Sequence, residues 1–337
     1  MKKLIATILI AALTLTLLSS CSGLFNDKNN GATDEQVQIR IGYMTGPTGM
    51  GMAKLISENG GLENGNEKYS FKKYADTATA KADLAAGNID LICLPTNEAA
   101  VYFNTVDKNA KVLAVNCLNS LYLLTSSVYM VSSLADLEGQ TVYTCKNGTP
   151  RIILQHIIDE LGLNINVSYE IDGKEIVTPQ DLSTCVILGS VPNAVMPEPL
   201  VTSSLLTISK NDTPHINYTV DVNLADEWNK ICDTPVTMGC VIASGSFVKN
   251  HKSSIDAFLE EYKASVDYIG DSTNLDSAAN YVVETEVMAA APAAKKALKN
   301  LGNAISYIDG SNMKVALIAF YNAIGIKLPD DDFYYEK

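Results

Sequence analysis

VQIRIGYMTGPTGMGMAKLI, residues 37–56, contains the pattern that the rest of the chain repeats. Apolar and polar side chains alternate from Val37 to Tyr43, which predicts a strand. A segment rich in glycine and threonine follows, and the apolar residues after it predict a helix from about Gly49 to Glu58. A strand that passes through a short flexible loop into a helix is the repeating unit of an α/β fold.

Three further strands and one helix are predicted before the middle of the chain. The strands are YSFKKY (69–74), IDLICL (89–94) and KVLAVNC (111–117), and the helix ATAKADLAAG ends at Gly87, a usual C-cap position. Strands that alternate with helices predict a mostly parallel sheet covered by helices.

The pattern then starts again and predicts a second α/β unit. We expect strands at about 140–145, at VSYEI (167–171) and at CVILG (185–189), with a helix over TPRIILQHIIDELGL (149–163) between the first two. From about residue 246 onward, amphipathic periodicity predicts almost only helices. Two α/β units and a helical tail are typical of a two-lobed protein.

The N-terminal segment MKKLIATILIAALTLTLLSSC has the composition of a targeting sequence. Two lysines precede an apolar run over residues 4–18, which is short for a membrane span. The run ends in Leu-Ser-Ser-Cys, which resembles a bacterial lipobox, so we expect a signal peptide over 1–20 and lipidation of Cys21; a plain secretory signal is the alternative. Residues 21–36 would form a polar tether that holds the protein at the extracytoplasmic face of the bacterial cell membrane.

Charge and cysteine content argue against several classes of partner. The chain has 25 Lys and Arg against 38 Asp and Glu, with no basic block, which disfavours nucleic acid and anionic membrane surfaces. The cysteines after Cys21 lack the CxxC or Cys/His spacing of a zinc site, and most lie in apolar runs typical of buried free thiols. A disulfide between Cys232 and Cys240 is an open alternative. We expect no metal and no cofactor.

Five stretches, taken in order along the chain, carry a resemblance to a known family. They are IGYMTGPTGMGMAKL, LAAGNIDLICLPTNEA, LADLEGQTVYTCKNGTPR, VMPEPLVT and IGIKLPDDDFYY. Together they resemble the substrate-binding lipoproteins of ABC importers, in the branch associated with sulfonates, nitrate, taurine and pyrimidine precursors of thiamine. The resemblance covers about residues 37–335 and implies a monomer whose partners are a small-molecule ligand and the ABC permease subunits.

This resemblance also implies a fold and its division into lobes. The fold would be α/β, of the type II periplasmic-binding-protein-like kind, with two lobes joined by two hinge strands. Lobe 1 would comprise residues 37–122 plus 238–337, and lobe 2 would comprise residues 123–237. The chain would cross between the lobes at LNSLYLLT and at TPVTMGCVIA, and the ligand would lie between them.

In an open α/β sheet, ligands bind beyond the carboxyl ends of the strands. The glycines of the first loop would let the backbone approach a ligand, and lobe 1 would tolerate a side chain at Gly49. Thr48 and Thr149 would each cap a helix whose free N–H groups face the ligand. The alternative is a plain turn with no ligand. The expected ligand-binding residues are Thr45, Gly46, Thr48, Gly49, Met50, Thr96, Asn97, Asn119, Asn147, Gly148, Thr149, Arg151, Glu198 and Thr237.

Two of these positions leave alternatives open, and so does the ligand. Arg151 would either clamp an anionic group or be solvated. Glu198 would either accept a hydrogen bond from a ligand amine or cap a helix. Two helix starts and one arginine favour an anionic ligand, whereas a flat ring would use the aromatic residues Tyr43, Tyr102, Tyr122, Tyr143 and Trp228.

Three functions compete, and capture of a small molecule for an importer is the preferred one. An enzyme of thiamine-pyrimidine synthesis on the same fold would carry a cysteine-rich cluster that this sequence lacks. None of the three histidines has a Cys, Asp or Ser partner at a useful spacing, so we expect no catalytic residue. The third function is a receptor that presents its ligand to a membrane sensor.

Overall fold

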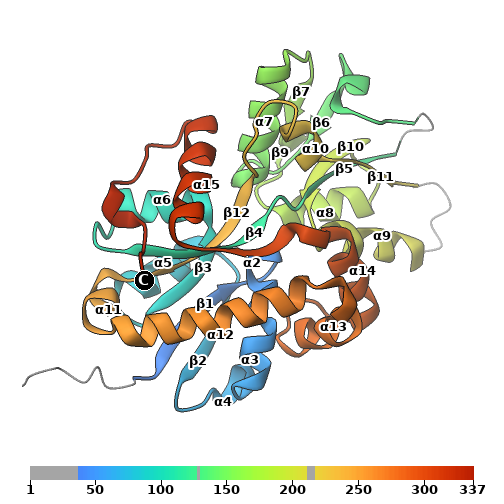
Figure 1. Cartoon of the computed structure of the whole chain (residues 1–337). Coiled ribbons are helices and arrows are strands. Elements are labelled where there is room, and N and C mark those ends of the chain that lie inside the picture. The colour runs from blue at the N-terminus through green and yellow to red at the C-terminus, as the bar shows by residue number, and fades with distance from the viewer. Residues whose placement is uncertain (1–36, 127–129, 211–216) are drawn as a thin grey trace, which may run out of the picture. The chain divides into compact units, whose positions relative to one another are not determined.

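The computed structural model describes residues 37–126, 130–210 and 217–337, and these contain two main sheets, each covered by helices (Figure 1). The predicted signal peptide, tether and Cys21 lie outside the described residues. The larger sheet has six strands in the order β13 (Ile305–Ile308), β4 (Lys111–Leu118), β12 (Thr237–Ala243), β3 (Leu91–Pro95), β1 (Ile39–Met44) and β2 (Tyr69–Tyr74).

The smaller main sheet has five strands, and a short ribbon of two strands accompanies it. The order is β11 (Thr219–Asn223), β5 (Leu121–Thr125), β10 (Asn193–Pro197), β6 (Thr141–Tyr143) and β7 (Asn166–Ser168); the ribbon pairs β8 (Glu170–Ile171) with β9 (Lys174–Glu175).

The chain passes from the six-stranded to the five-stranded sheet between β4 and β5. It returns between β11 and β12, through α10 (Leu224–Trp228). Because β12 enters the six-stranded sheet from the other unit, it runs antiparallel to both of its neighbours, β3 and β4. The sheet is mixed: the predicted strands β1 to β4 all run in one direction, as expected, whereas β12 and β13 run against them.

Helices of the first unit and of the C-terminal tail accompany the six-stranded sheet. The long helix α12 lies along this sheet (Figure 1), where Tyr262 contacts β3 and β4 through Cys93 and Asn116. These helices are α2 (Pro47–Met50), α3 (Ala53–Glu58), α4 (Gly61–Asn64), α5 (Thr77–Ala85), α6 (Thr96–Thr105), α11 (Gly245–Asn250), α12 (Lys252–Gly270), α13 (Leu275–Glu284), α14 (Ala291–Leu301) and α15 (Gly310–Ala323).

The second unit contributes the helices that accompany the five-stranded sheet. They are α7 (Thr149–Leu161), α8 (Pro179–Ile187) and α9 (Leu200–Lys210). Single 3-10 turns complete the described chain at η1 (Leu134–Leu137), η2 (Ser272–Asn274), η3 (Gly302–Ala304) and η4 (Asp331–Phe333).

The predicted strand CVILG is wrong, because these residues end helix α8. Thr178 caps that helix: its hydroxyl accepts a hydrogen bond from the Asp181 backbone N–H (3.2 Å), and the Asp181 carboxylate accepts one from the Thr178 backbone N–H (2.8 Å). Pro179 begins the helix with the φ that a helix needs. The strand that follows is NAVMP, and the helical tail also contains one unpredicted strand, β13, at the edge of the larger sheet.

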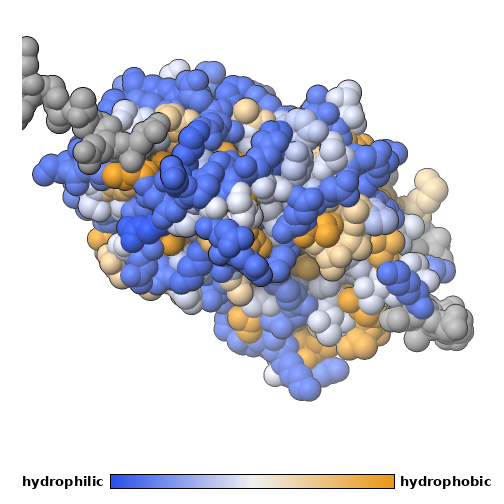
Figure 2. Space-filling view, turned by 90° about the horizontal axis from the view of Figure 1, so that it is seen from below, coloured by the Kyte–Doolittle hydropathy of each residue, from blue (hydrophilic) through white to orange (hydrophobic). Residues whose placement is uncertain are grey.

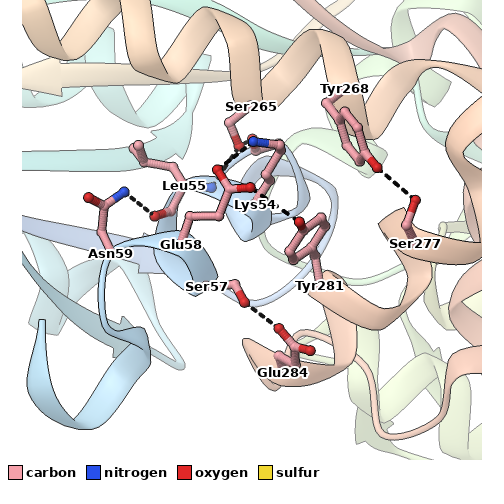
Figure 3. Close-up of polar contacts among 11 residues, drawn as sticks. Lys54, Leu55, Ser57, Glu58, Asn59, Ser265, Tyr268, Ser277, Tyr281 and Glu284 are labelled. Carbon is pink, nitrogen blue, oxygen red and sulfur yellow. Dashed lines mark hydrogen bonds and ion pairs between the residues drawn. The ribbon is translucent and has the colours of Figure 1, made fainter.

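The predicted helix over Gly49–Glu58 is broken into α2 and α3 around Gly51 and Met52. Ser265 of α12 compensates the break, because its hydroxyl donates to the Gly51 carbonyl (2.7 Å) and accepts from the Leu55 N–H (3.0 Å). Figure 3 shows the polar contacts that hold α3 against the tail, including Tyr281 Oη to Glu58 Oε1 at 3.2 Å. The C-terminal helices therefore fix the position of the first loop.

The surface carries no extended hydrophobic face in the view of Figure 2, where hydrophobic residues form small scattered groups among hydrophilic ones. No helix in the described part of the chain is both long enough and apolar enough to cross a membrane. All six described cysteines are free, Cys232 and Cys240 included, and Cys93, Cys117, Cys145 and Cys240 are buried.

Candidate functional site

Strands of the two main sheets end close together where the chain passes between the sheets, and we call this junction the crevice. β4 ends at Leu118 and β5 begins at Leu121, so only two residues separate the edge of one sheet from the edge of the other. The carboxyl ends of β1 and β3 lie at the same end of the larger sheet as that of β4. β12 begins there, because it is antiparallel to β3 and β4. Side chains that follow these strand ends are therefore brought together.

Four of the predicted residues are in direct contact at this crevice, and one of their two contacts crosses it. The Thr149 hydroxyl, in the first turn of α7, donates to Asn97 Oδ1 (2.9 Å), in the first turn of α6. The Thr96 hydroxyl donates to the carbonyl of Thr237 at the start of β12. All four side chains are buried. The Thr149–Asn97 contact joins the first turns of two helices from different units, and the Thr96–Thr237 contact joins α6 to β12 within one unit.

Sequence reasoning missed Asn116, the polar residue at the centre of this cluster. It is fully buried on β4, and its Nδ2 donates to the Thr48 carbonyl (3.0 Å) and to Tyr262 Oη (2.6 Å). Gly239 on the neighbouring strand has no side chain because a Cβ would lie 2.6 Å from Asn116 Oδ1. The available signal was an asparagine inside the otherwise apolar strand KVLAVNC.

We call Thr48, Thr96, Asn97, Asn116, Thr149 and Thr237 the crevice cluster; each is buried and uncharged. Two of its atoms, Asn116 Oδ1 and Thr237 Oγ1, are buried without any hydrogen-bond partner. A buried polar atom left unpaired costs about 1–3 kcal/mol, so such atoms usually have a role. The crevice cluster thus offers one acceptor, the Asn116 amide oxygen, and one hydroxyl that can donate or accept.

Comparison with solved structures decides the fold. A structure titled an ABC transporter from Parabacteroides distasonis shares 19% identity with this chain, covers 89% of it and 99% of its own length, and has a TM-score of 0.69. The periplasmic aliphatic sulphonate binding protein SsuA from Escherichia coli shares 17% identity over 89% of this chain and 92% of its own, with a TM-score of 0.65. The chain has the periplasmic-binding-protein fold.

A third similar structure is more distant. The periplasmic nitrate-binding protein NrtA from Synechocystis PCC 6803 shares 13% identity, covers 83% of this chain and 75% of its own, and has a TM-score of 0.58. No family profile and no curated protein sequence matches the chain.

Within this periplasmic-binding-protein fold, the first loop is organised differently from the prediction. Gly46, with φ of 109°, stands at the N-cap of α2, and the Thr48 side chain caps nothing, so that predicted cap is wrong. A Cβ on Gly49 would lie 2.1 Å from the Met44 carbonyl oxygen. The expected tolerance of Gly49 is therefore wrong as well, because that glycine packs against β1. Met50 is buried and Thr45 is exposed.

The loop before α7 also departs from its predicted cap. Helix α7 begins at Thr149, Gly148 stands at its N-cap with φ of 97°, and no side chain caps the helix. The Thr149 hydroxyl instead reaches Asn97, as described above. Asn147 and Gly148 are exposed.

Arg151 does not reach the crevice cluster. Its side chain is exposed, its guanidinium lies over the Tyr169 ring at 5.7 Å from the centroid, and it lines a separate cavity of ≈ 390 Å³ against Ala323–Gly325 at the end of α15. The solvated alternative therefore describes this arginine, and the predicted anion clamp has no support from its position.

Glu198 is a helix-capping residue that also bridges the two units. Its fully buried carboxylate accepts from the Thr202 backbone N–H (3.0 Å), the Thr202 hydroxyl (2.8 Å) and Asn300 Nδ2 of α14 (2.7 Å). Burial raises the pKa of Glu198, and these donors partly oppose that rise. The Asn300 carbonyl in turn accepts from Tyr122 Oη at 2.7 Å.

The aromatic residues proposed for a flat ring are mostly in the core. Tyr43, Tyr102, Tyr122 and Trp228 are buried, and only Tyr143 is half-buried. Tyr43 Oη donates to the Thr285 carbonyl (3.0 Å) and Trp228 Nε1 to the Thr234 carbonyl (2.8 Å), so their polar atoms are already used.

A cavity of ≈ 920 Å³ lies at the opposite end of the strands of the six-stranded sheet from the crevice cluster. Its lining includes Gly87 before β3, Lys111 at the start of β4 and Ser244 after β12. We place the candidate site at the crevice cluster because the unpaired polar atoms and the helix starts converge there, at the carboxyl ends of the strands. The cavity of ≈ 920 Å³ is the larger space, but its volume does not show which chemical groups it would bind. No group of three or more His, Cys, Asp or Glu side chains within the described residues is arranged to hold a metal.

Proposed function

We propose that the protein captures a small molecule between two lobes and delivers it to an ABC importer. The two lobes are residues 37–122 plus 238–337 and residues 123–237, and lipidation of Cys21 holds the protein at the extracytoplasmic face of the cell membrane. The partners are the small molecule and the permease subunits, and the protein acts as a monomer. The observation that carries the proposal is the pair of unpaired polar atoms in the crevice cluster, Asn116 Oδ1 and Thr237 Oγ1.

The chemistry of the crevice cluster narrows the ligand class. Its side chains are uncharged, so they cannot neutralise a multiply charged ion. The first turns of α6 and α7 supply partial positive charge, which suits a neutral or singly anionic polar group. The flat-ring alternative loses support, because four of the five aromatic residues named for it are buried in the core.

Thr237→Val tests this proposal with opposite effects on binding and on folding. The change keeps the shape of the side chain and removes the unpaired hydroxyl. The free energy of unfolding should stay the same or rise, because a buried unsatisfied group is removed. Mass spectrometry identifies the ligand that co-purifies with the protein. Calorimetry should then show that the variant binds this ligand about tenfold more weakly than the wild type does.

Thr285→Val is the matched control variant. Thr285 is also a buried threonine, but its hydroxyl donates to the Tyr281 carbonyl (2.9 Å) on α13, and Thr285 is not part of the crevice cluster. This variant should lose about 1 kcal/mol of stability and keep wild-type affinity. If Thr237→Val binds as tightly as the wild type, the crevice cluster is not the ligand site.

A further inference from the structure

A third cavity, of ≈ 240 Å³, lies where the chain passes between the two main sheets. Three segments line it: the end of β4 at Leu118–Asn119, residues between Asn223 and Val236 before β12, and Leu301, Asn303 and Ala304 at and after the end of α14. The first two are the connections between the sheets. The cavity shares no residue with the crevice cluster. Both connections between the sheets therefore contribute to the walls of one cavity.

Asn119 is one of the residues that line this cavity, and its amide group is held in one orientation. Its side chain is 7% exposed, and its Nδ2 donates to Asn223 Oδ1 at 2.9 Å, which fixes the orientation of the amide. Its Oδ1 is buried and has no partner. Asn223 Oδ1 accepts a second bond from the Ala225 N–H (3.0 Å), so the Asn223 amide group still has its N–H donors to offer.

The remaining walls are uncharged throughout. Side-chain amides of Asn229 and Asn303 join those of Asn119 and Asn223, and the other lining residues are apolar, Trp228 among them. An ion would lose its hydration there without meeting an opposite charge, which is costly. An uncharged molecule with a donor beside an acceptor would pair with both asparagines and fill the apolar part.

We propose that this cavity is a second binding site, for a small uncharged molecule of the amide class. The donor of such a molecule bonds to Asn119 Oδ1, and its acceptor takes an N–H of Asn223. Because the occupant touches both connections between the sheets, it alters the affinity of the crevice for its ligand, and the crevice ligand alters the affinity of this cavity equally. That coupling rests on the proposed function, whereas the binding itself does not.

The single tryptophan of the chain makes the binding directly measurable. Trp228 lines the cavity, so its fluorescence reports occupancy without a label. We choose N-methylacetamide as the probe and N,N-dimethylacetamide as its control, because the two have similar size and only the first has an N–H donor. The first should give a saturable change in fluorescence of the full protein. The second should bind about tenfold more weakly, since it leaves Asn119 Oδ1 unpaired.

Two variants separate this cavity from the crevice. Ala225→Leu places a larger side chain on the lining without removing a polar group, and it should abolish the saturable response. Thr237→Val should keep that response, because Thr237 belongs to the crevice cluster. An equal, non-saturating response to both amides in the wild type overturns the proposal even if Ala225→Leu fails to fold. Loss of the response in Thr237→Val also overturns it, since the probe would then occupy the crevice.

Discussion

Asn300→Ala removes the one side chain of α14 that hydrogen-bonds to the buried carboxylate of Glu198. The variant loses the bond from Asn300 Nδ2 to Glu198 Oε1 (2.7 Å) and a longer one to the Thr202 hydroxyl (3.2 Å). It keeps the bond from Tyr122 Oη, because that hydroxyl donates to the Asn300 backbone carbonyl. Hydrogen bonds to charged groups contribute about 1.5–3 kcal/mol, so we expect a loss of this size near neutral pH.

The size of this loss should depend on pH. Burial raises the pKa of Glu198 in the folded protein, so the stability linked to its protonation is fully present below the unfolded pKa and is lost as pH rises through the folded pKa. Asn300 opposes the rise by bonding to the carboxylate. Removing Asn300 raises the pKa of Glu198 further, so the variant loses more stability than the wild type, and over a wider range of pH. The difference between wild type and variant should therefore grow as pH increases from about 4 toward 7.

Urea unfolding followed by Trp228 fluorescence, repeated across this pH range, measures the effect. Asn250→Ala is the control, because Asn250 Nδ2 donates only to the exposed Ser246 carbonyl (3.0 Å). That variant should lose less than about 0.5 kcal/mol at every pH. A loss in Asn300→Ala that is equally small and independent of pH would refute the bridge between α14 and Glu198.

Three further predictions concern the first loop, the arginine and the anchor. Gly49→Ala should lower the free energy of unfolding by more than about 1 kcal/mol in urea titrations, because its Cβ would overlap the Met44 carbonyl oxygen. Gly51→Ala is the comparison, because Gly51 has a φ of -60° that suits alanine and its Cβ would meet only the Val266 side chain, at 3.0 Å; an equal loss in both variants would contradict the close approach. Arg151→Gln should leave ligand affinity within about twofold in calorimetry, since Arg151 lies on Tyr169 outside the crevice cluster, and a tenfold loss would restore the anion clamp. Cys21→Ser should move the protein from the membrane fraction to the soluble fraction, and full retention in membranes would disprove lipidation.

Local patterns in the sequence were sufficient to place most strands and to predict that four polar residues lie together. YSFKKY, IDLICL and KVLAVNC became β2, β3 and β4, because short apolar or alternating runs between turn residues have few other ways to be buried. Ligand positions after strand ends followed from the geometry of α/β sheets, which brought Thr96, Asn97, Thr149 and Thr237 together.

The errors arise where a residue's role depends on contacts distant in sequence. Four apolar residues in CVILG fit a strand or a buried helix turn equally well, and the cap at Thr178 that distinguishes them lies seven residues earlier. From the sequence alone, Gly49 is indistinguishable from a flexible loop residue, because its close approach to Met44 of β1 exists only in the folded chain. The Arg151 side chain points where it does because its guanidinium lies over the Tyr169 ring. The role of Asn116 depends on its hydrogen bond to Tyr262, which is 146 residues away.

The central claim is that this chain binds a small molecule in the crevice and returns it unchanged. The direct test is a crystal structure of the secreted Cys21→Ser protein with its co-purified ligand, combined with mass spectrometry of that ligand before and after incubation. We predict one molecule per chain, of unaltered mass, within hydrogen-bonding distance of Asn116 Oδ1 and Thr237 Oγ1. A ligand bound elsewhere, with both of these atoms still unpaired, or a ligand converted to a product would contradict the account.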